Sequence, residues 1–207
     1  MHMLNRYLLV GDSFWGAPTG SADILADLLL VDFPEIPLSF SIHCSSRNSL
    51  DALFRNCPRD IIGRQAGFTV LCIGWEDMHG TMDAATIIQQ AQQLLHEILH
   101  NSPSHIIITT IPTIQHTAES IQRSKIQAYN EFLRSSHKPE RMVVVDLDHI
   151  FTRYQELQIS RGELVRNLFT DHGTLGVLGQ MLCARTLSQE LLRSDRRFLG
   201  ELGLTLP

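Results

Sequence analysis

Short apolar runs alternate along the chain with longer stretches that have helical periodicity. Predicted strands lie at 7–10, 38–43, 68–73, 105–110 and 141–147. Predicted helices, with apolar residues every three or four positions, lie at 21–30, 49–56, 83–100, 117–136 and 175–192. Strands separated by helices of this length form βαβ units, so the pattern predicts a parallel sheet in a doubly wound α/β sandwich. The runs HIIITT and MVVVDL are apolar on both faces, as expected of strands covered by helices on both sides.

The composition fits one globular domain and excludes several classes of function. The 207 residues are 43% hydrophobic and 19% charged, and we expect a single domain over 1–207. The net charge of −5 comes from interspersed acids and bases, so no basic block indicates nucleic-acid binding. We see no signal peptide, and no apolar stretch approaches the roughly 18 to 20 residues that span a bilayer. Four cysteines without CxxC spacing favour reduced, mostly buried thiols and a cytoplasmic protein.

Polar clusters follow two of the predicted strands and precede the last predicted helix. Gly11-Asp12-Ser13 ends the first strand abruptly, and Gly74-Trp75-Glu76-Asp77 follows the third. A segment with an Asp/His pair, 170–174, stands just before the last helix. Because the carboxyl ends of parallel strands meet at one edge of the sheet, where ligands of such folds bind, we expect these clusters to converge on one mouth.

In this order, the clusters and their surroundings resemble the sequence blocks of the SGNH/GDSL hydrolase family, mostly esterases, lipases and sugar deacetylases. The similar segments are LLVGDSFWG, HCSSRNSLDALFRN, VLCIGWED, IIITTIPTI, IQAYNEFLR and TDHGTLGVLGQMLCARTL. The resemblance covers nearly the whole chain. It implies a flavodoxin-like three-layer α/β/α sandwich with a five-stranded parallel sheet. It also implies Ser13 as nucleophile, Gly74 at the start of the third block, and an oxyanion hole that includes the backbone N–H groups of Ser13 and Ser46.

Two positions depart from the family pattern. Counted from Asp171, the family histidine, glycine and alanine fall on Thr174, Gly179 and Ala184, so threonine replaces the general base. Threonine cannot act as a base near neutral pH, and loss of a triad member costs about 10⁴- to 10⁶-fold in turnover. In the third block, Glu76 stands where the family has an asparagine that donates to the oxyanion. Unless it is protonated, a carboxylate only accepts and repels the oxyanion, and losing one donor alone costs roughly 3 to 4 kcal/mol.

These departures leave two function hypotheses open. In the first, the protein is a divergent serine ester hydrolase, with Ser13 as nucleophile and Asp171 plus His172 as an irregular acid/base pair. His79, just past the third predicted strand, is an alternative base. In the second, an SGNH-fold protein no longer hydrolyses and serves as a binding or adaptor module for a protein partner. We expect a small-molecule ester or acylated ligand in the first case, and neither hypothesis calls for a metal or another cofactor.

The same residues also have structural interpretations. Ser13 and Asp171 can each cap the start of a helix, where serine and aspartate satisfy free N–H groups. Asp12 is better explained by stabilising a turn than by catalysis. Glu76 and Asp77 can form a solvated loop pair, or a carboxylate pair that binds a cation if a third ligand is present.

Two further features of the sequence are better explained by packing and exposure than by chemistry. Trp15 and Trp75 flank the predicted mouth, where they either stack on a ligand or pack at the rim. The segment from His96 through Glu97 to His100 has the HExxH spacing of zinc metalloproteases. Both histidines lie on the side of the predicted helix opposite its apolar arc, so we expect them to face solvent.

Overall fold

One parallel sheet of five strands organises the part of the chain that the computed structural model describes, residues 6–16, 20–113, 120–138, 140–162, 167–170 and 174–201. The strands are β1 (Arg6–Gly11), β2 (Ser39–Cys44), β3 (Phe68–Cys72), β4 (His105–Thr109) and β5 (Met142–Val145), and their order in the sheet is β2-β1-β3-β4-β5. The helices are α1 (Ser21–Asp32), α2 (Leu50–Asp60), α3 (Trp75–Met78), α4 (Ala84–Asn101), α5 (Ser120–Ser135), α6 (Leu147–Ser160) and α7 (Val177–Glu201), with a 3-10 helix at Ile62–Arg64.

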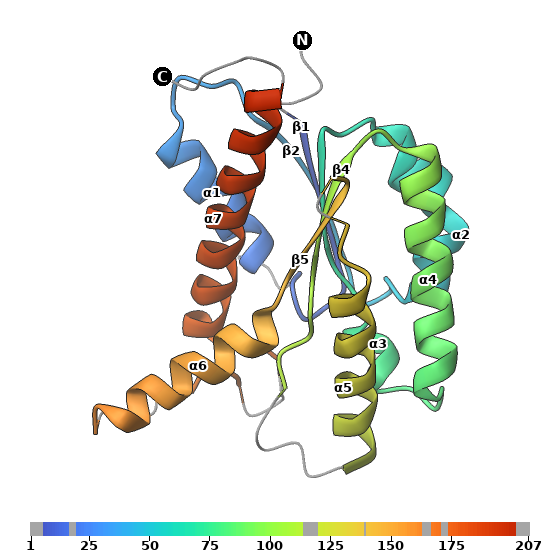
Figure 1. Cartoon of the computed structure of the whole chain (residues 1–207), viewed down its shortest axis with the longest axis vertical. Coiled ribbons are helices and arrows are strands. Elements are labelled where there is room, and N and C mark those ends of the chain that lie inside the picture. The colour runs from blue at the N-terminus through green and yellow to red at the C-terminus, as the bar shows by residue number, and fades with distance from the viewer. Residues whose placement is uncertain are drawn as a thin grey trace.

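The helices cover both faces of the sheet and make a three-layer sandwich. In Figure 1, α1 and α7 lie on one face, while α2, α4 and α5 lie on the other. Every residue of β3 is buried, and four of the five residues of β4 are buried, because helices press on both sides of these central strands. The predicted three-layer fold with a five-stranded parallel sheet is confirmed.

The strand order places a topological switch point beside β1. The connection from β1 runs to β2 and the connection from β3 runs to β4, so the two leave in opposite directions, and the carboxyl ends of β1 and β3 border the switch point. The register places Gly11, the last residue of β1, beside both Cys44 of β2 and Cys72 of β3. The turns that follow these three strands therefore begin side by side.

Two α-helices, α3 and α6, and the 3-10 helix were not predicted, and the boundaries of other elements differ. The predicted strand 141–147 ends at Val145, because the Asp146 carboxylate accepts the His149 N–H at 3.2 Å and caps α6. The short helix α3 occupies the segment predicted as a loop after the third strand. Helix α7 begins at Val177, two residues later than predicted. Residues 117–119 of the predicted fourth helix lie outside the described residues.

The cysteines are free thiols, and most are buried as predicted. Cys57, Cys72 and Cys183 are buried, and Cys44 is half-buried. Within the ranges described above, no helix combines the length and the apolar character needed to cross a membrane.

Candidate functional site

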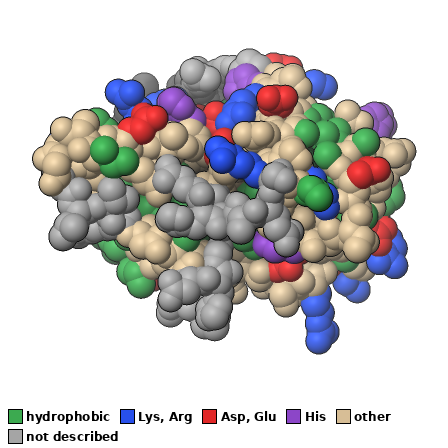
Figure 2. All heavy atoms as spheres, turned by 90° about the horizontal axis from the view of Figure 1, so that it is seen from below, with side chains coloured by type: hydrophobic (Ala, Val, Ile, Leu, Met, Phe, Trp, Pro, Cys, Tyr) green, Lys and Arg blue, Asp and Glu red, His purple; other side chains and the backbone are tan. Residues whose placement is uncertain are grey.

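The carboxyl ends of the strands lie at the lower end of the molecule in Figure 1, and Figure 2 looks at that end directly. On this face, the described acidic, basic and histidine side chains are interspersed with hydrophobic ones rather than gathered in one patch. The chemistry of this end therefore depends on individual contacts, and the contacts that bear on the predicted site lie in the turns after β1, β2 and β3.

Ser13 lies in the tight turn that follows β1, and it does not cap a helix. The Asp12 carbonyl oxygen accepts the N–H groups of Trp15 at 3.2 Å and Gly16 at 3.1 Å, which closes the turn. Helix α1 begins only at Ser21, so the capping interpretation of Ser13 is wrong. The half-buried Ser13 hydroxyl instead donates a hydrogen bond to Oε1 of Glu76.

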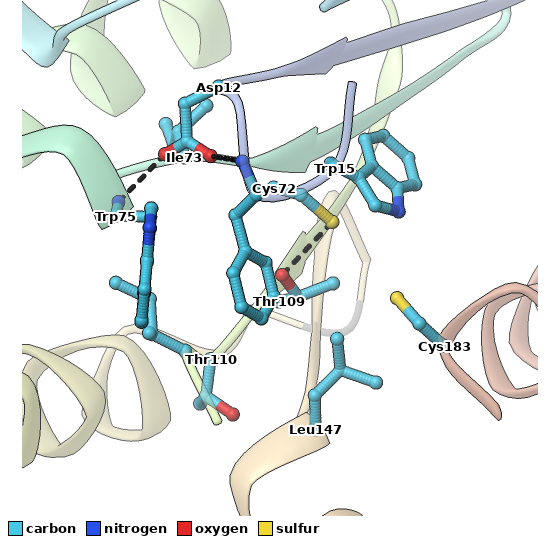
Figure 3. Close-up of a pocket in the computed structure, with 11 residues that line it drawn as sticks. Asp12, Trp15, Cys72, Ile73, Trp75, Thr109, Thr110, Leu147 and Cys183 are labelled. Atoms are coloured by element: carbon cyan, nitrogen blue, oxygen red, sulfur yellow. Dashed lines mark hydrogen bonds between the residues drawn. The ribbon is translucent and has the colours of Figure 1, made fainter. Parts of the chain in front are cut away.

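The Asp12 carboxylate joins the turn after β1 to the start of α3. One oxygen accepts the Phe14 N–H at 3.1 Å, and the other accepts the N–H groups of Trp75 at 2.7 Å and Glu76 at 3.4 Å (Figure 3). Asp12 is only 1% exposed. Burial raises the pKa of Asp12 to about 7, although the N–H groups of Trp75 and Phe14 act in the opposite direction. Asp12 stabilises the turn, as predicted, and it also places Glu76 next to Ser13.

Gly74 allows the chain to turn sharply from β3 into α3. Its φ of 102° lies in the left-handed region, and a Cβ at this position would stand 3.0 Å from the Tyr129 ring. The buried Tyr129 hydroxyl donates to the Ile73 carbonyl oxygen at 3.2 Å and so fixes the end of the strand. Tyr129 was not among the residues predicted for the site, and its place in the IQAYNEFLR segment is the signal that could have revealed it.

Asp77 is a buried structural acceptor rather than part of a solvated pair. It is 3% exposed, and its carboxylate accepts the Leu50 N–H at 3.1 Å at the start of α2. Burial raises the pKa of Asp77, with the Leu50 N–H acting against the rise. Glu76, by contrast, turns toward Ser13. The two carboxylates are engaged separately, so neither the solvated-pair interpretation nor a shared cation is supported.

The turn that contains Ser46 is fastened to the end of β1. The Gly11 carbonyl oxygen accepts the Ser45 N–H at 3.0 Å and the Asn48 side-chain amide at 2.8 Å. The same amide also reaches the His43 carbonyl oxygen at 2.8 Å. Ser46 itself is exposed at the tip of this turn. Ser45 and Asn48, on either side of Ser46, both bind Gly11, which directly precedes Asp12. The Ser46 backbone is therefore held close to the turn that carries Ser13.

The segment before α7 is described only on either side of residues 171–173. Thr170 donates its N–H to the Thr174 carbonyl oxygen at 2.8 Å, and the two hydroxyl oxygens lie 2.8 Å apart. Gly179 packs closely on this segment, since a Cβ there would stand 2.2 Å from the Leu168 carbonyl oxygen. Asp171 and His172 lie outside the described residues, so their predicted role stays a prediction.

The two tryptophans belong to the core rather than to a rim. Trp15 is 0% exposed and Trp75 is 5% exposed. Trp75 packs between the rings of Phe14 and His79, each with its centroid 4.6 Å away. Both tryptophans line a small pocket with room for about one water molecule, and Cys183 of α7 closes its far side (Figure 3). Because neither Ser13 nor Glu76 lines this pocket, it is not the predicted substrate mouth.

The remaining candidate histidines are engaged elsewhere or exposed. Nδ1 of His79 lies 2.9 Å from the Trp75 carbonyl oxygen, and the described contacts of Ser13 do not include it. His96 and His100 lie on the exposed face of α4 with their rings 6.0 Å apart. The prediction that these two histidines face solvent is confirmed.

No known family profile matches the chain, and no curated protein matches it in sequence. The structure is nevertheless similar to solved esterase structures. It resembles Axe2, an acetylxylan esterase from Geobacillus stearothermophilus, with a TM-score of 0.72 and 19% identity over 90% of this chain and 94% of that chain. The acetyl xylan esterase AlAXEase gives 0.73 and 19%, over 89% and 98% of the two chains. LAE5, an alpha/beta hydrolase enzyme from the metagenome of Lake Arreo, Spain, gives 0.71 and 16%, over 92% and 94%. These likenesses establish the fold, and the activity must be argued from the site.

Proposed function

We propose that this protein is a serine ester hydrolase of the SGNH/GDSL type with an altered catalytic site, acting on a small carboxylic ester or acylated ligand. The observation that carries the proposal is the hydrogen bond from the Ser13 hydroxyl to the Glu76 carboxylate. It joins a nucleophile candidate after β1 to a proton acceptor after β3, at the switch point where ligands of this fold class bind. The ordered sequence blocks and the fold shared with acetylxylan esterases support the same conclusion.

In the proposed reaction, Ser13 Oγ attacks the ester carbonyl carbon, the alcohol leaves, and water then hydrolyses the acyl-serine. The N–H groups of Ser13 and Ser46 hold the negative oxygen of the tetrahedral intermediate. Solved structures of Axe2 include catalytic mutants in which a serine, an aspartate or a histidine is replaced by alanine. By analogy, Asp171 and His172, the acid/base pair proposed from the sequence, are one candidate for the general base, and Glu76, which accepts the Ser13 hydroxyl, is the other. The reaction needs no cofactor.

Labelling with a fluorophosphonate probe tests this proposal. The wild-type protein is expected to be labelled at Ser13 and to hydrolyse p-nitrophenyl acetate, and Ser13→Ala is expected to lose both properties. Ser135, exposed at the end of α5, provides a matched control. Ser135→Ala is expected to label and turn over like the wild type, because the Ser135 hydroxyl bonds only the Phe132 carbonyl oxygen of its own helix among its described contacts. A folded wild-type protein that takes no label between pH 5 and 9 would reject the hydrolase proposal.

The alternative is an SGNH-fold binding or adaptor protein without activity. The same Glu76 carboxylate favours it, because this group stands where the family resemblance expects an oxyanion donor, and Thr174 stands at the expected histidine. This alternative predicts a folded protein that neither labels nor hydrolyses but still binds its ligand or protein partner. In either case, the four free cysteines, most of them buried, lead us to propose a cytoplasmic location.

A further inference from the structure

We propose that Glu76 is the catalytic base that takes the proton from Ser13 Oγ, so that the nucleophile is activated by a carboxylate rather than by an imidazole. The inference deepens the proposed function and rests on it. By the family resemblance alone, Glu76 is only the loss of an oxyanion-hole donor; here the same residue has a positive role as the base.

The direction of the hydrogen bond is the first argument. The Ser13 hydroxyl donates to Oε1 of Glu76, so the carboxylate occupies the side of Ser13 from which its proton must leave. A general base must lie within hydrogen-bond reach of the proton it removes, and Glu76 meets this requirement directly. Within the described residues, no histidine has a hydrogen bond to Ser13, and His79 is engaged by the Trp75 carbonyl oxygen.

The way Glu76 is held is the second argument. Its backbone N–H is fixed by the buried Asp12 carboxylate, which also fixes the turn that carries Ser13. One residue later, Asp77 ties the same short helix to the start of α2. Gly74 and the Tyr129 ring set the point where this helix begins. A base held from several sides in this way is preorganised against its nucleophile, which is the arrangement that proton transfer needs.

As the base, Glu76 does not repel the oxyanion in the way an ionised carboxylate would. Proton transfer from Ser13 Oγ to Glu76 accompanies formation of the bond from Oγ to the carbonyl carbon, so Glu76 is a neutral carboxylic acid when the oxyanion exists. A neutral acid no longer repels that oxygen and is a hydrogen-bond donor. It gives its proton to the leaving alcohol as the ester C–O bond breaks. In deacylation it takes a proton from the attacking water and returns one to Ser13 as the acid product leaves.

The central test compares Glu76→Gln with the matched control Glu156→Gln, whose side chain is exposed on α6. The acylation rate is measured as the burst of p-nitrophenol from p-nitrophenyl acetate. Glu76→Gln keeps the shape and supplies the kind of amide donor that the family has at this position and this chain lacks, but it cannot take a proton. We expect it to slow acylation by about 100-fold or more, and Glu156→Gln to leave acylation near the wild-type rate. If Glu76→Gln is as fast as the wild type or faster, or if Glu156→Gln slows acylation as much as Glu76→Gln does, Glu76 is not the base.

A rescue experiment keeps the inference testable if Glu76→Gln folds poorly. Glu76→Ala opens space for a small carboxylate, and added formate is expected to restore acylation in proportion to its concentration, while chloride at equal ionic strength has no effect. Loss of a merely structural contact would not be repaired by formate, so an absence of rescue in a folded protein overturns the proposal. The outcome for the proposed function is separate, because that function fails only if the wild-type protein itself is neither labelled nor active.

Discussion

The buried carboxylate of Asp12 makes a definite prediction about stability and pH. The side chain is 1% exposed and contacts the backbone N–H groups of Phe14, Trp75 and Glu76. Burial removes water from the charged form and raises the pKa of Asp12 from 3.8 to about 7 in the folded protein. In the unfolded chain the same carboxyl loses its proton near its ordinary value. Between these two pH values, the folded state therefore holds one proton that the unfolded state has released.

The sign and size of the effect follow from linkage. Where the folded state binds the additional proton, the free energy of unfolding falls as pH rises, by about 1.4 kcal/mol for each pH unit. A difference of about 3 units in the pKa of Asp12 corresponds to a loss of about 4 kcal/mol between pH 4 and pH 7. This stability is fully present below pH 4 and is lost once the pH has passed about 7. Burial also raises the pKa of Asp77, which adds a loss of the same sign.

Urea denaturation of the wild type and of Asp12→Asn, measured at several pH values from 4 to 8, isolates this contribution. Asparagine does not titrate, so the difference in unfolding free energy, wild type minus variant, is expected to fall by about 4 kcal/mol over this range. Asp27, exposed on α1, gives a matched control. Asp27→Asn is expected to change the free energy of unfolding by no more than about 0.5 kcal/mol at any pH. A wild-type minus Asp12→Asn difference that stays constant, or that grows with pH, would refute the reasoning.

Two further substitutions test how α3 is held. Gly74→Ala forces a side chain into the left-handed region, where its Cβ meets the Tyr129 ring at 3.0 Å, and we expect a loss of about 1 to 3 kcal/mol in urea denaturation. Unchanged stability would show that the turn does not need glycine. Asp77→Ala leaves the Leu50 N–H without its buried acceptor, and a loss of about 1 to 3 kcal/mol is expected in the same assay. If Asp77→Ala instead stabilises the protein, the burial cost of the carboxylate exceeds the value of its hydrogen bond.

The sheet could be predicted from the sequence because burial on both faces leaves a strong pattern. The run that became β4 is apolar at successive positions, and only a covered parallel strand accommodates that composition. Helix α6 was missed for a local reason. Asp146 directly follows an apolar run, so the predicted strand continued through it to residue 147. Its carboxylate instead caps the next helix. Strand and helix are joined there without a loop, so no Gly or Pro marks the boundary.

The site was predictable only as a set of neighbouring segments. Strand ends determine that the turns after β1 and β3 are adjacent, which is why Ser13 and Glu76 were candidates together. Nothing in the spacing tells which way a side chain points at such an end. Trp15 and Trp75 were expected at the mouth, either stacked on a ligand or packed at the rim, and they are core residues. Asp77 was expected with Glu76 in a solvated or cation-binding pair, and it is buried and bonded to the start of α2. The places of Trp75 and Asp77 go with the hydrogen bonds from the Trp75 N–H to Asp12 and from the Leu50 N–H to Asp77, which join residues far apart in the sequence.

Ionisation of Asp12 has opposite effects on the fold and on the site. It lowers the stability of the folded protein, but it keeps the Ser13 turn aligned with α3. Burying this carboxylate lowers stability at neutral pH, but as an ion it offers an acceptor at both oxygens to the N–H groups of Phe14, Trp75 and Glu76. A protonated carboxyl or an asparagine amide presents a donor at one of these positions, so either change releases one side of the link between the Ser13 turn and α3. Asp12→Asn should therefore gain stability relative to the wild type as the pH rises and yet react more slowly at Ser13. That combination identifies a side chain whose hydrogen bonds serve the site more than the fold.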